Sequence, residues 1–82
     1  MAGKSQELKF EIINQIGVIS TSARGWNVEL NRVSWNGNEP KYDVRSWSPD
    51  HTKMGKGITL SEDELIVLCA LLTKEVEFLK KE

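Results

Sequence analysis

Three side chains that could bind a nucleic acid, two of them basic and one aromatic, alternate with one aspartate along a short segment of this sequence. Lys41, Asp43, Arg45 and Trp47 are each separated by one residue, so in a β-strand their side chains would point to the same side. An exposed indole ring offers a flat surface on which a base can stack, and neighbouring cations can neutralise the flanking phosphates. The spacing therefore predicts a strand face that binds single-stranded nucleic acid.

Other aromatic, basic and amide side chains could extend this face. These further candidates are Trp35, Lys53, Lys56, Arg24, Trp26 and Asn31. Trp35 would share a strand side with Asn31 and would end beside the loop that carries Lys41. Four alternatives stay open. Trp47 could pack in the core, and Arg45 could form no more than a surface ion pair across strands. Trp26 could pack in the core, because it shares its strand side with Val28, and Asn31 could be a turn or edge hydrogen-bonding residue.

Alternation of apolar and polar residues predicts the strands that would carry these side chains. The pattern covers residues 8–18, 26–35 and 41–48, and a fourth strand is expected at 56–60. Gly17 interrupts the first of these segments, which indicates a bulge or bend there. An Asn-Gly pair between the second and third segments is a strong hairpin signal. We therefore expect four antiparallel strands.

One helix is expected after the strands. Ser61 followed by Glu64 matches the capping-box pattern, and successive helix positions advance by about 100°. Two apolar stripes result, one of Leu65, Leu68, Cys69, Leu72, Val76 and Leu79 and the other of Val67, Leu71 and Phe78. The first stripe is expected to cover the sheet and to bury Cys69. The second would be exposed in a monomer, so we expect it to form a homodimer interface, with cover by the chain's own loops as the alternative.

The composition favours a small binding protein over an enzyme. The 82 residues allow one domain, expected at 1–82 with a flexible segment at 1–7. His51 and Cys69 are the only residues of their types, and no metal-ligand spacing, catalytic set or phosphate loop is present. No cofactor, metal or small-molecule substrate is therefore expected. Without a membrane-length apolar run or a signal-peptide core, we expect a cytoplasmic protein that associates with the nucleoid when bound to DNA.

Opposite charges are concentrated in different parts of the chain, although the formal net charge is only -1. Residues 24–57 contain six basic and four acidic side chains, a net charge of +2, and they also contain all three tryptophans. Residues 61–82 contain three basic and six acidic side chains, a net charge of -3. This separation fits a sheet that binds a polyanion, followed by an acidic helix.

The segment KYDVRSWSPDHTKMGKGITL, residues 41–60, resembles the transcriptional positive-cofactor-four (PC4) family, and specifically its bacterial YdbC-like branch. In that family a DxR-aromatic strand precedes a loop and a KGI-Ser/Thr-L strand that leads into a helix. Here these motifs are DVRSW at 43–47 and KGITL at 56–60. The resemblance covers residues 10–79, nearly the whole chain, and departs from the family in a longer loop with Glu39 and Pro40.

The resemblance implies an α+β fold, with a curved four-stranded antiparallel sheet followed by one C-terminal helix and dimerisation through the helices. It also implies channels that bind single-stranded DNA. By position, Trp35 matches the aromatic residue before the second-to-third strand loop, Lys41 the basic end of that loop, and Arg45 the strand arginine. Trp47 lies where the family's neighbouring aromatics cluster, and Lys56 opens the KGI strand.

We therefore expect a coactivator-like homodimer that binds single-stranded DNA with little sequence specificity and acts in transcription regulation, replication or repair. RNA stays open as a ligand. The main alternative is a protein-protein interaction module with an exposed tryptophan and arginine hot spot. The dependence of affinity on salt distinguishes DNA binding from protein binding, because phosphate binding weakens steeply with ionic strength. A catalytic domain acting on nucleic acid would need a metal site, for which the sequence offers no ligand set.

Overall fold

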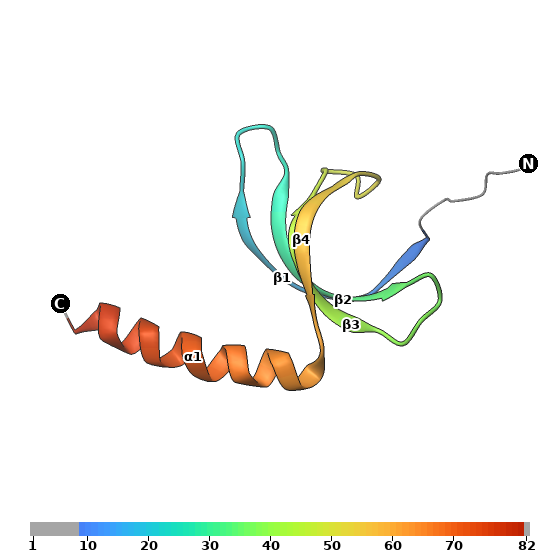
Figure 1. The fold of residues 1–82 in the computed structure, drawn as a ribbon. Coiled ribbons are helices and arrows are strands. Elements are labelled where there is room, and N and C mark those ends of the chain that lie inside the picture. Colours follow the sequence, from blue (N-terminus) through green and yellow to red (C-terminus); the bar gives the residue numbers. More distant parts are fainter. Residues whose placement is uncertain (1–8, 82) are drawn as a thin grey trace, which may run out of the picture.

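Four antiparallel strands followed by one helix make up the structure (Figure 1). The computed structural model describes residues 9–81, so Leu8 and the expected flexible segment 1–7 lie outside the described residues. The elements are β1 (Phe10–Thr21), β2 (Asn27–Trp35), β3 (Lys41–Trp47), β4 (Met54–Leu60) and α1 (Glu62–Lys80). The strands pair in the order β1-β2-β3-β4. The expected fold class, a four-stranded antiparallel sheet with a C-terminal helix, is confirmed.

Strand β1 is longer and more strongly bent than the sequence pattern predicts (Figure 1). Its pairing with β2 shifts register three times, between Ile12 and Asn14, between Gln15 and Gly17, and between Val18 and Ser20. Each shift inserts one extra residue into β1, and such bulges bend a strand and increase its twist. The bulge expected near Gly17 is confirmed, and the other two explain why the alternation is blurred around Ile13 and Ile19.

A tight turn connects β2 to the loop before β3. Asn36 and Gly37 have φ values of 53° and 75°, and the Asn38 N–H donates to the Trp35 carbonyl at 2.9 Å. Positive φ at both central residues is typical of a type I′ turn, as the Asn-Gly pair predicts. Asn36 also bonds to Lys9, since its N–H donates to the Lys9 carbonyl at 2.7 Å. The turn therefore fixes the start of β1 beside the end of β2.

The alternation predicts that the polar face of β3 is exposed, but in the structure this face is the more deeply buried of the two. The face that carries Asp43 and Trp47, termed the inner face, is enclosed, and Val33 joins these two side chains with no exposed surface. The ring of Phe10 in β1 packs 5.2 Å from the ring of Trp47. The prediction of an exposed polar face on β3 is wrong, because the bent β1 folds over that face.

The helix begins where the sequence predicts. The Ser61 hydroxyl accepts a hydrogen bond from the Glu64 N–H at 3.1 Å, and the Glu64 carboxylate accepts one from the Ser61 N–H at 2.9 Å. No residue of α1 is buried, and the expected burial of Cys69 is wrong, since its side chain is exposed. Among the described residues, no helix has the length and apolar character needed to cross a membrane.

An open apolar groove of about 720 Å³ lies between α1 and the sheet. Leu68, Leu72 and Val76 line its helix side, and Leu30 and Val44 line its sheet side. The first apolar stripe therefore faces the sheet without closing on it, so the expectation that it covers the sheet within one chain is wrong. The second stripe, which consists of Val67, Leu71 and Phe78, is exposed as well. Both stripes contact water in a single chain.

Candidate nucleic-acid interface

The inner face is built around an ion pair between Asp43 and Arg45. The Arg45 Nε and Nη2 atoms donate to the two carboxylate oxygens of Asp43 at 2.7 and 2.9 Å. The Thr59 hydroxyl donates to the same carboxylate at 3.0 Å, and Arg45 Nη1 donates to the Gly55 carbonyl at 3.3 Å. Bidentate pairs of this kind have a fixed geometry. Arg45, whose side chain is only 16% exposed, is therefore held tightly.

The guanidinium group of Arg45 lies over the indole ring of Trp35. Its Cζ atom is 4.8 Å from the ring centroid, within the range of a cation–π interaction. The Phe10 ring also packs near Trp35, with centroids 6.0 Å apart and ring planes tilted by 51°. Trp35 is half-buried. It is thus the tryptophan of the inner face that keeps an accessible surface for a base.

A hollow of about 300 Å³ opens beside Trp35 and is lined by Asn38, Glu39, Lys41 and Thr59. Lys41 is exposed, so its ammonium group can reach a phosphate next to a base stacked on Trp35. The structure therefore brings together Trp35 and Lys41, as the sequence predicts.

Trp47 does not provide the exposed stacking surface that the sequence suggests. Its side chain has no exposed surface, and it is enclosed between Phe10 and the ring of His51, whose centroid is 5.7 Å away. Its indole nitrogen has no hydrogen-bond partner among the described residues. An indole ring enclosed in this way packs as core, so the expected exposure of Trp47 is wrong.

Asn31 is also enclosed rather than accessible. It is 1% exposed, and its Nδ2 donates to Glu29 at 2.9 Å. The Nε2 atom of His51 lies 2.9 and 3.1 Å from the two oxygens of the same carboxylate. The structure thus gives Asn31 a hydrogen-bonding role, because its amide helps to satisfy a buried carboxylate, and its contact with a nucleic acid stays a prediction.

The loop between β3 and β4 has its own hydrogen-bond network around Asp50. The Thr52 hydroxyl, the Thr52 N–H and the Ser48 hydroxyl donate to its carboxylate at 2.7, 3.1 and 2.9 Å. These bonds, led by the Thr52 hydroxyl, lower the pKa of Asp50 from 3.8 to about 2. The Lys53 N–H donates to Ser48 Oγ at 3.0 Å, so the loop fixes the backbone of Lys53 while its side chain stays exposed.

The basic candidates fall into two groups at opposite ends of the sheet. Arg24 and Lys53 lie at one end, where the β1–β2 turn touches the β3–β4 loop, since a Cβ on Gly25 would come within 3.3 Å of Pro49. The half-buried Trp26 precedes β2 at this end, and Lys41 lies at the other. Because β3 has seven residues at about 3.3 Å each, the ends are roughly 20 Å apart.

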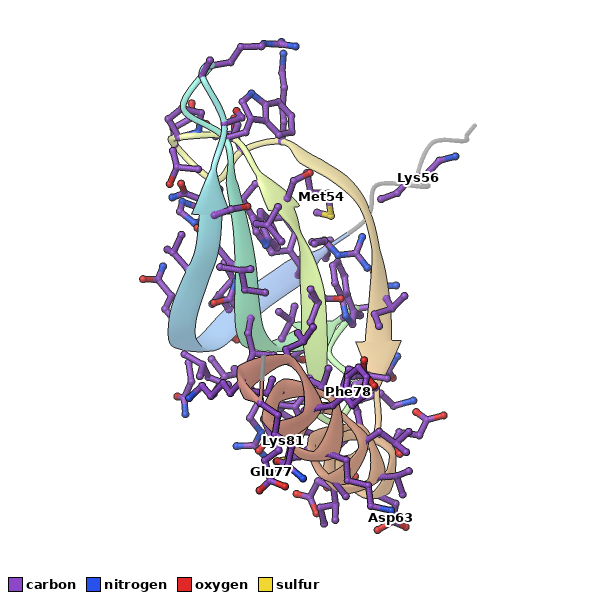
Figure 2. All side chains as sticks on the ribbon, turned by 90° about the vertical axis from the view of Figure 1, so that its left-hand side faces the viewer. Met54, Lys56, Asp63, Glu77, Phe78 and Lys81 are labelled. Carbon is purple, nitrogen blue, oxygen red and sulfur yellow. The ribbon has the colours of Figure 1, made fainter. Side chains whose placement is uncertain are left out.

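Lys56 lies between these two groups on the edge strand β4. Its side chain is exposed and extends away from the sheet (Figure 2). The four candidate lysines and arginines with exposed side chains are therefore distributed along the sheet rather than gathered at one point. A bound strand would have to run along the sheet to meet more than one group.

Replacing Gly57 by alanine is expected to lower the free energy of unfolding by about 1–3 kcal/mol. A Cβ at this position would overlap the Val44 carbonyl oxygen and the Cβ of Arg45, so β4 would have to move away from β3. Urea unfolding followed by circular dichroism measures the change. Gly17→Ala is the matched control, because a Cβ there meets nothing within 4 Å. Equal losses in both variants would contradict the close approach of β4 to Arg45.

Sequence reasoning missed three residues that shape the inner face, namely Phe10, Glu29 and His51. Phe10 pairs directly with Trp35, so correct registration of β1 against β2 could have revealed it. His51 has a φ of 61°, and nothing in the local sequence indicates that its ring reaches Glu29, 22 positions away. These residues become part of the face only when the sheet curves.

Comparison with known proteins identifies the family. The family model for Transcriptional Coactivator p15 (PC4) matches residues 22–71, more than half of the chain. The chain belongs to the PC4 family. An uncharacterised protein of Treponema pallidum (strain Nichols) is 47% identical over 68 residues, which cover 83% of this chain and 80% of the relative. The resemblance seen in DVRSW and KGITL is thereby confirmed for the family.

The PC4 match contains the whole candidate interface except Phe10 and the rest of β1. It includes β2, β3, β4 and the first half of α1, and hence both Trp35 and the Asp43–Arg45 ion pair. Within residues 9–81, no group of three or more His, Cys, Asp or Glu side chains is placed to hold a metal ion.

Proposed function

We propose that this PC4-family protein binds single-stranded DNA with little sequence specificity and acts in transcription regulation, replication or repair. The observation that carries the proposal is the half-buried Trp35 beside the exposed Lys41, at a hollow large enough for a base. A base stacks on the indole, and the lysine neutralises the next phosphate. Stacking is available to every base, so affinity depends little on sequence. The same chemistry accommodates RNA.

Further cations extend binding along the sheet. Lys56 on β4 and Lys53 and Arg24 at the far end are exposed, and each can neutralise a phosphate of a strand that follows the sheet. This surface and the family match support a coactivator-like DNA-binding role, which in our proposal is non-catalytic and is exercised in the cytoplasm and on the nucleoid. The relative from Treponema pallidum supports placement in a bacterial branch of the family.

The functional unit in this proposal is a homodimer formed through α1. Among residues 9–81, twelve large apolar side chains are exposed, and half of them belong to the two stripes of the helix, namely Val67, Leu71, Leu72, Val76, Phe78 and Leu79. A second copy offers an identical apolar helix and groove, so a two-fold arrangement covers both surfaces at once. Covering them is favourable by about 25 cal/mol for each Å² removed from water.

Trp35→Ala is expected to weaken binding of a labelled single-stranded oligonucleotide by about 5- to 150-fold, because stacking contributes about 1–3 kcal/mol per base. Fluorescence anisotropy at low and moderate salt measures the affinity, with the matching duplex as competitor. Trp35→Phe is the control, since it keeps an aromatic ring and should lose much less.

Three results would count against the proposed function. Equal affinity for duplex and single strand would contradict single-strand recognition, and unchanged binding by Trp35→Ala would contradict stacking. Absence of binding in the wild-type protein would favour a protein-protein interaction module. Such a module would bind its partner with little dependence on salt, whereas phosphate contacts weaken steeply as ionic strength rises.

A further inference from the structure

We infer that Arg45 is a positioning residue that holds the Trp35 ring in place for a base, and that it does not bind phosphate itself. The inference rests on the proposed function and assigns separate roles to the basic side chains of this sheet. Arg45 and its partner Asp43 set the geometry of stacking, while the exposed lysines and Arg24 supply the charge that attracts the strand.

The first step is that the hydrogen-bonding capacity of the ion pair is largely used within the protein. Asp43 has no exposed surface and accepts from Arg45 Nε, Arg45 Nη2 and Thr59. The third guanidinium nitrogen, Nη1, donates to the Gly55 carbonyl. A phosphate could take the Nε–Nη2 edge of Arg45, the edge that Asp43 occupies, only by displacing a buried carboxylate, which would then be left without its cation.

The second step is that Trp35 has no polar contact to fix its ring. Its Nε1 is buried without a hydrogen-bond partner among the described residues, so the ring is oriented by packing alone. That packing comes from the tilted Phe10 ring and from the Arg45 guanidinium at 4.8 Å. Of these two, only Arg45 is itself held by short hydrogen bonds.

The third step is that the backbone of β4 leaves room for this arrangement. Gly57 pairs with Arg45 across the sheet, and a Cβ there would overlap the Arg45 side chain. Any Cβ at Gly55, whose carbonyl accepts from Arg45, would overlap Ser46. Two glycines therefore let β4 lie close to β3 at the level of the guanidinium, which stabilises one orientation of Arg45 over Trp35.

The test compares affinity and its dependence on salt across a set of variants. Arg45→Lys keeps the positive charge but cannot form the bidentate pair or the flat stack. We expect it to weaken binding of a single-stranded oligonucleotide by about 3- to 30-fold, the range of a cation–π contact, with an unchanged slope of log affinity against log salt. Lys41→Gln, by contrast, should lower that slope by about 0.7.

Asp43→Asn distinguishes the positioning role of Arg45 from a purely electrostatic one, because the two roles predict opposite changes in affinity. If electrostatics alone determines the affinity for the oligonucleotide, removing a negative charge from the binding face should strengthen binding. The positioning role predicts the opposite, since Arg45 loses its partner and Trp35 its orientation. Tighter binding by Asp43→Asn, or an Arg45→Lys slope reduced as much as that of Lys41→Gln, would overturn the inference.

A measurement without DNA keeps this inference distinct from the proposed function. The indole N–H resonance of Trp35, assigned by its loss in Trp35→Phe, should shift and broaden in Arg45→Lys while the other two indole signals remain. An unchanged Trp35 resonance would refute positioning even if the wild-type protein binds DNA. If the wild-type protein binds no DNA and the resonance responds, the proposed function fails and the positioning of Trp35 by Arg45 stands.

Discussion

Trp47→Ala will lower the free energy of unfolding by about 3–5 kcal/mol, which is a large part of the 5–15 kcal/mol that stabilises most small domains. The indole ring has no exposed surface and contacts Phe10 and His51. Its removal leaves a cavity where β1 closes over the inner face. Urea unfolding followed by circular dichroism, at a fixed protein concentration, measures the loss.

The matched control for this prediction is Trp47→Phe. A phenyl ring retains most of the contact with Phe10, and it lacks the indole N–H, which has no hydrogen-bond partner within residues 9–81. We expect a clearly smaller loss of stability than for alanine. A Trp47→Ala variant with the wild-type unfolding midpoint would contradict the enclosed position of this side chain and would restore it as an exposed contact.

Leu72→Glu is expected to dissociate the proposed homodimer, raising its dissociation constant by at least about 100-fold. Leu72 lines the groove between α1 and the sheet, and burying its side chain contributes about 1.5–3 kcal/mol. A two-fold interface contains the substitution twice, and a carboxylate in an apolar contact adds a desolvation cost. Sedimentation equilibrium across a range of concentrations measures the dissociation constant.

Two further variants make the dimer prediction specific. Ala70→Glu places the same charged side chain on an exposed position of α1 that belongs neither to the groove nor to the second stripe, and it should leave the dimer intact. Leu71→Glu tests the second stripe of the helix in the same way as Leu72→Glu tests the first. A wild-type protein that sediments as a monomer would reject the homodimer, and dimers in both leucine variants would reject assembly through α1.

The secondary structure could be predicted because its signals are local. Asn36 and Gly37 adopt the positive φ values that their turn requires, and Ser61 and Glu64 form both bonds of the capping box. Each of these signals involves residues within a few positions of one another. No long-range information was needed to identify the strands, the hairpin or the start of the helix.

Which face of the sheet is buried could not be predicted from the alternation alone. Asp43 and Trp47 share a strand side, as expected, but their burial depends on three register shifts in β1 and on Phe10, far away in the sequence. A polar strand face is ordinarily taken as exposed, and here an ion pair and a carboxylate–amide network make its burial tolerable.

The part of the candidate site that depends on local sequence could be predicted. Trp35 and Lys41 flank one loop, so their proximity follows from a hairpin. The fixed position of Arg45 depends on Thr59 and on two glycines of another strand, which a pattern within β3 does not reveal. The exposure of both apolar stripes of α1 in the single chain is likewise not revealed by the periodicity of the helix.

The bulges in β1 have a consequence for the solubility of the protein. An open sheet has two edges, and a flat edge with a continuous row of free N–H and C=O groups can recruit a strand from another molecule. Three register shifts interrupt that row on β1, and the charged side chain of Lys56 extends from β4 at the other edge (Figure 2). Growth of fibrils through the sheet edges is therefore disfavoured, and aggregation should be governed by the apolar helix instead.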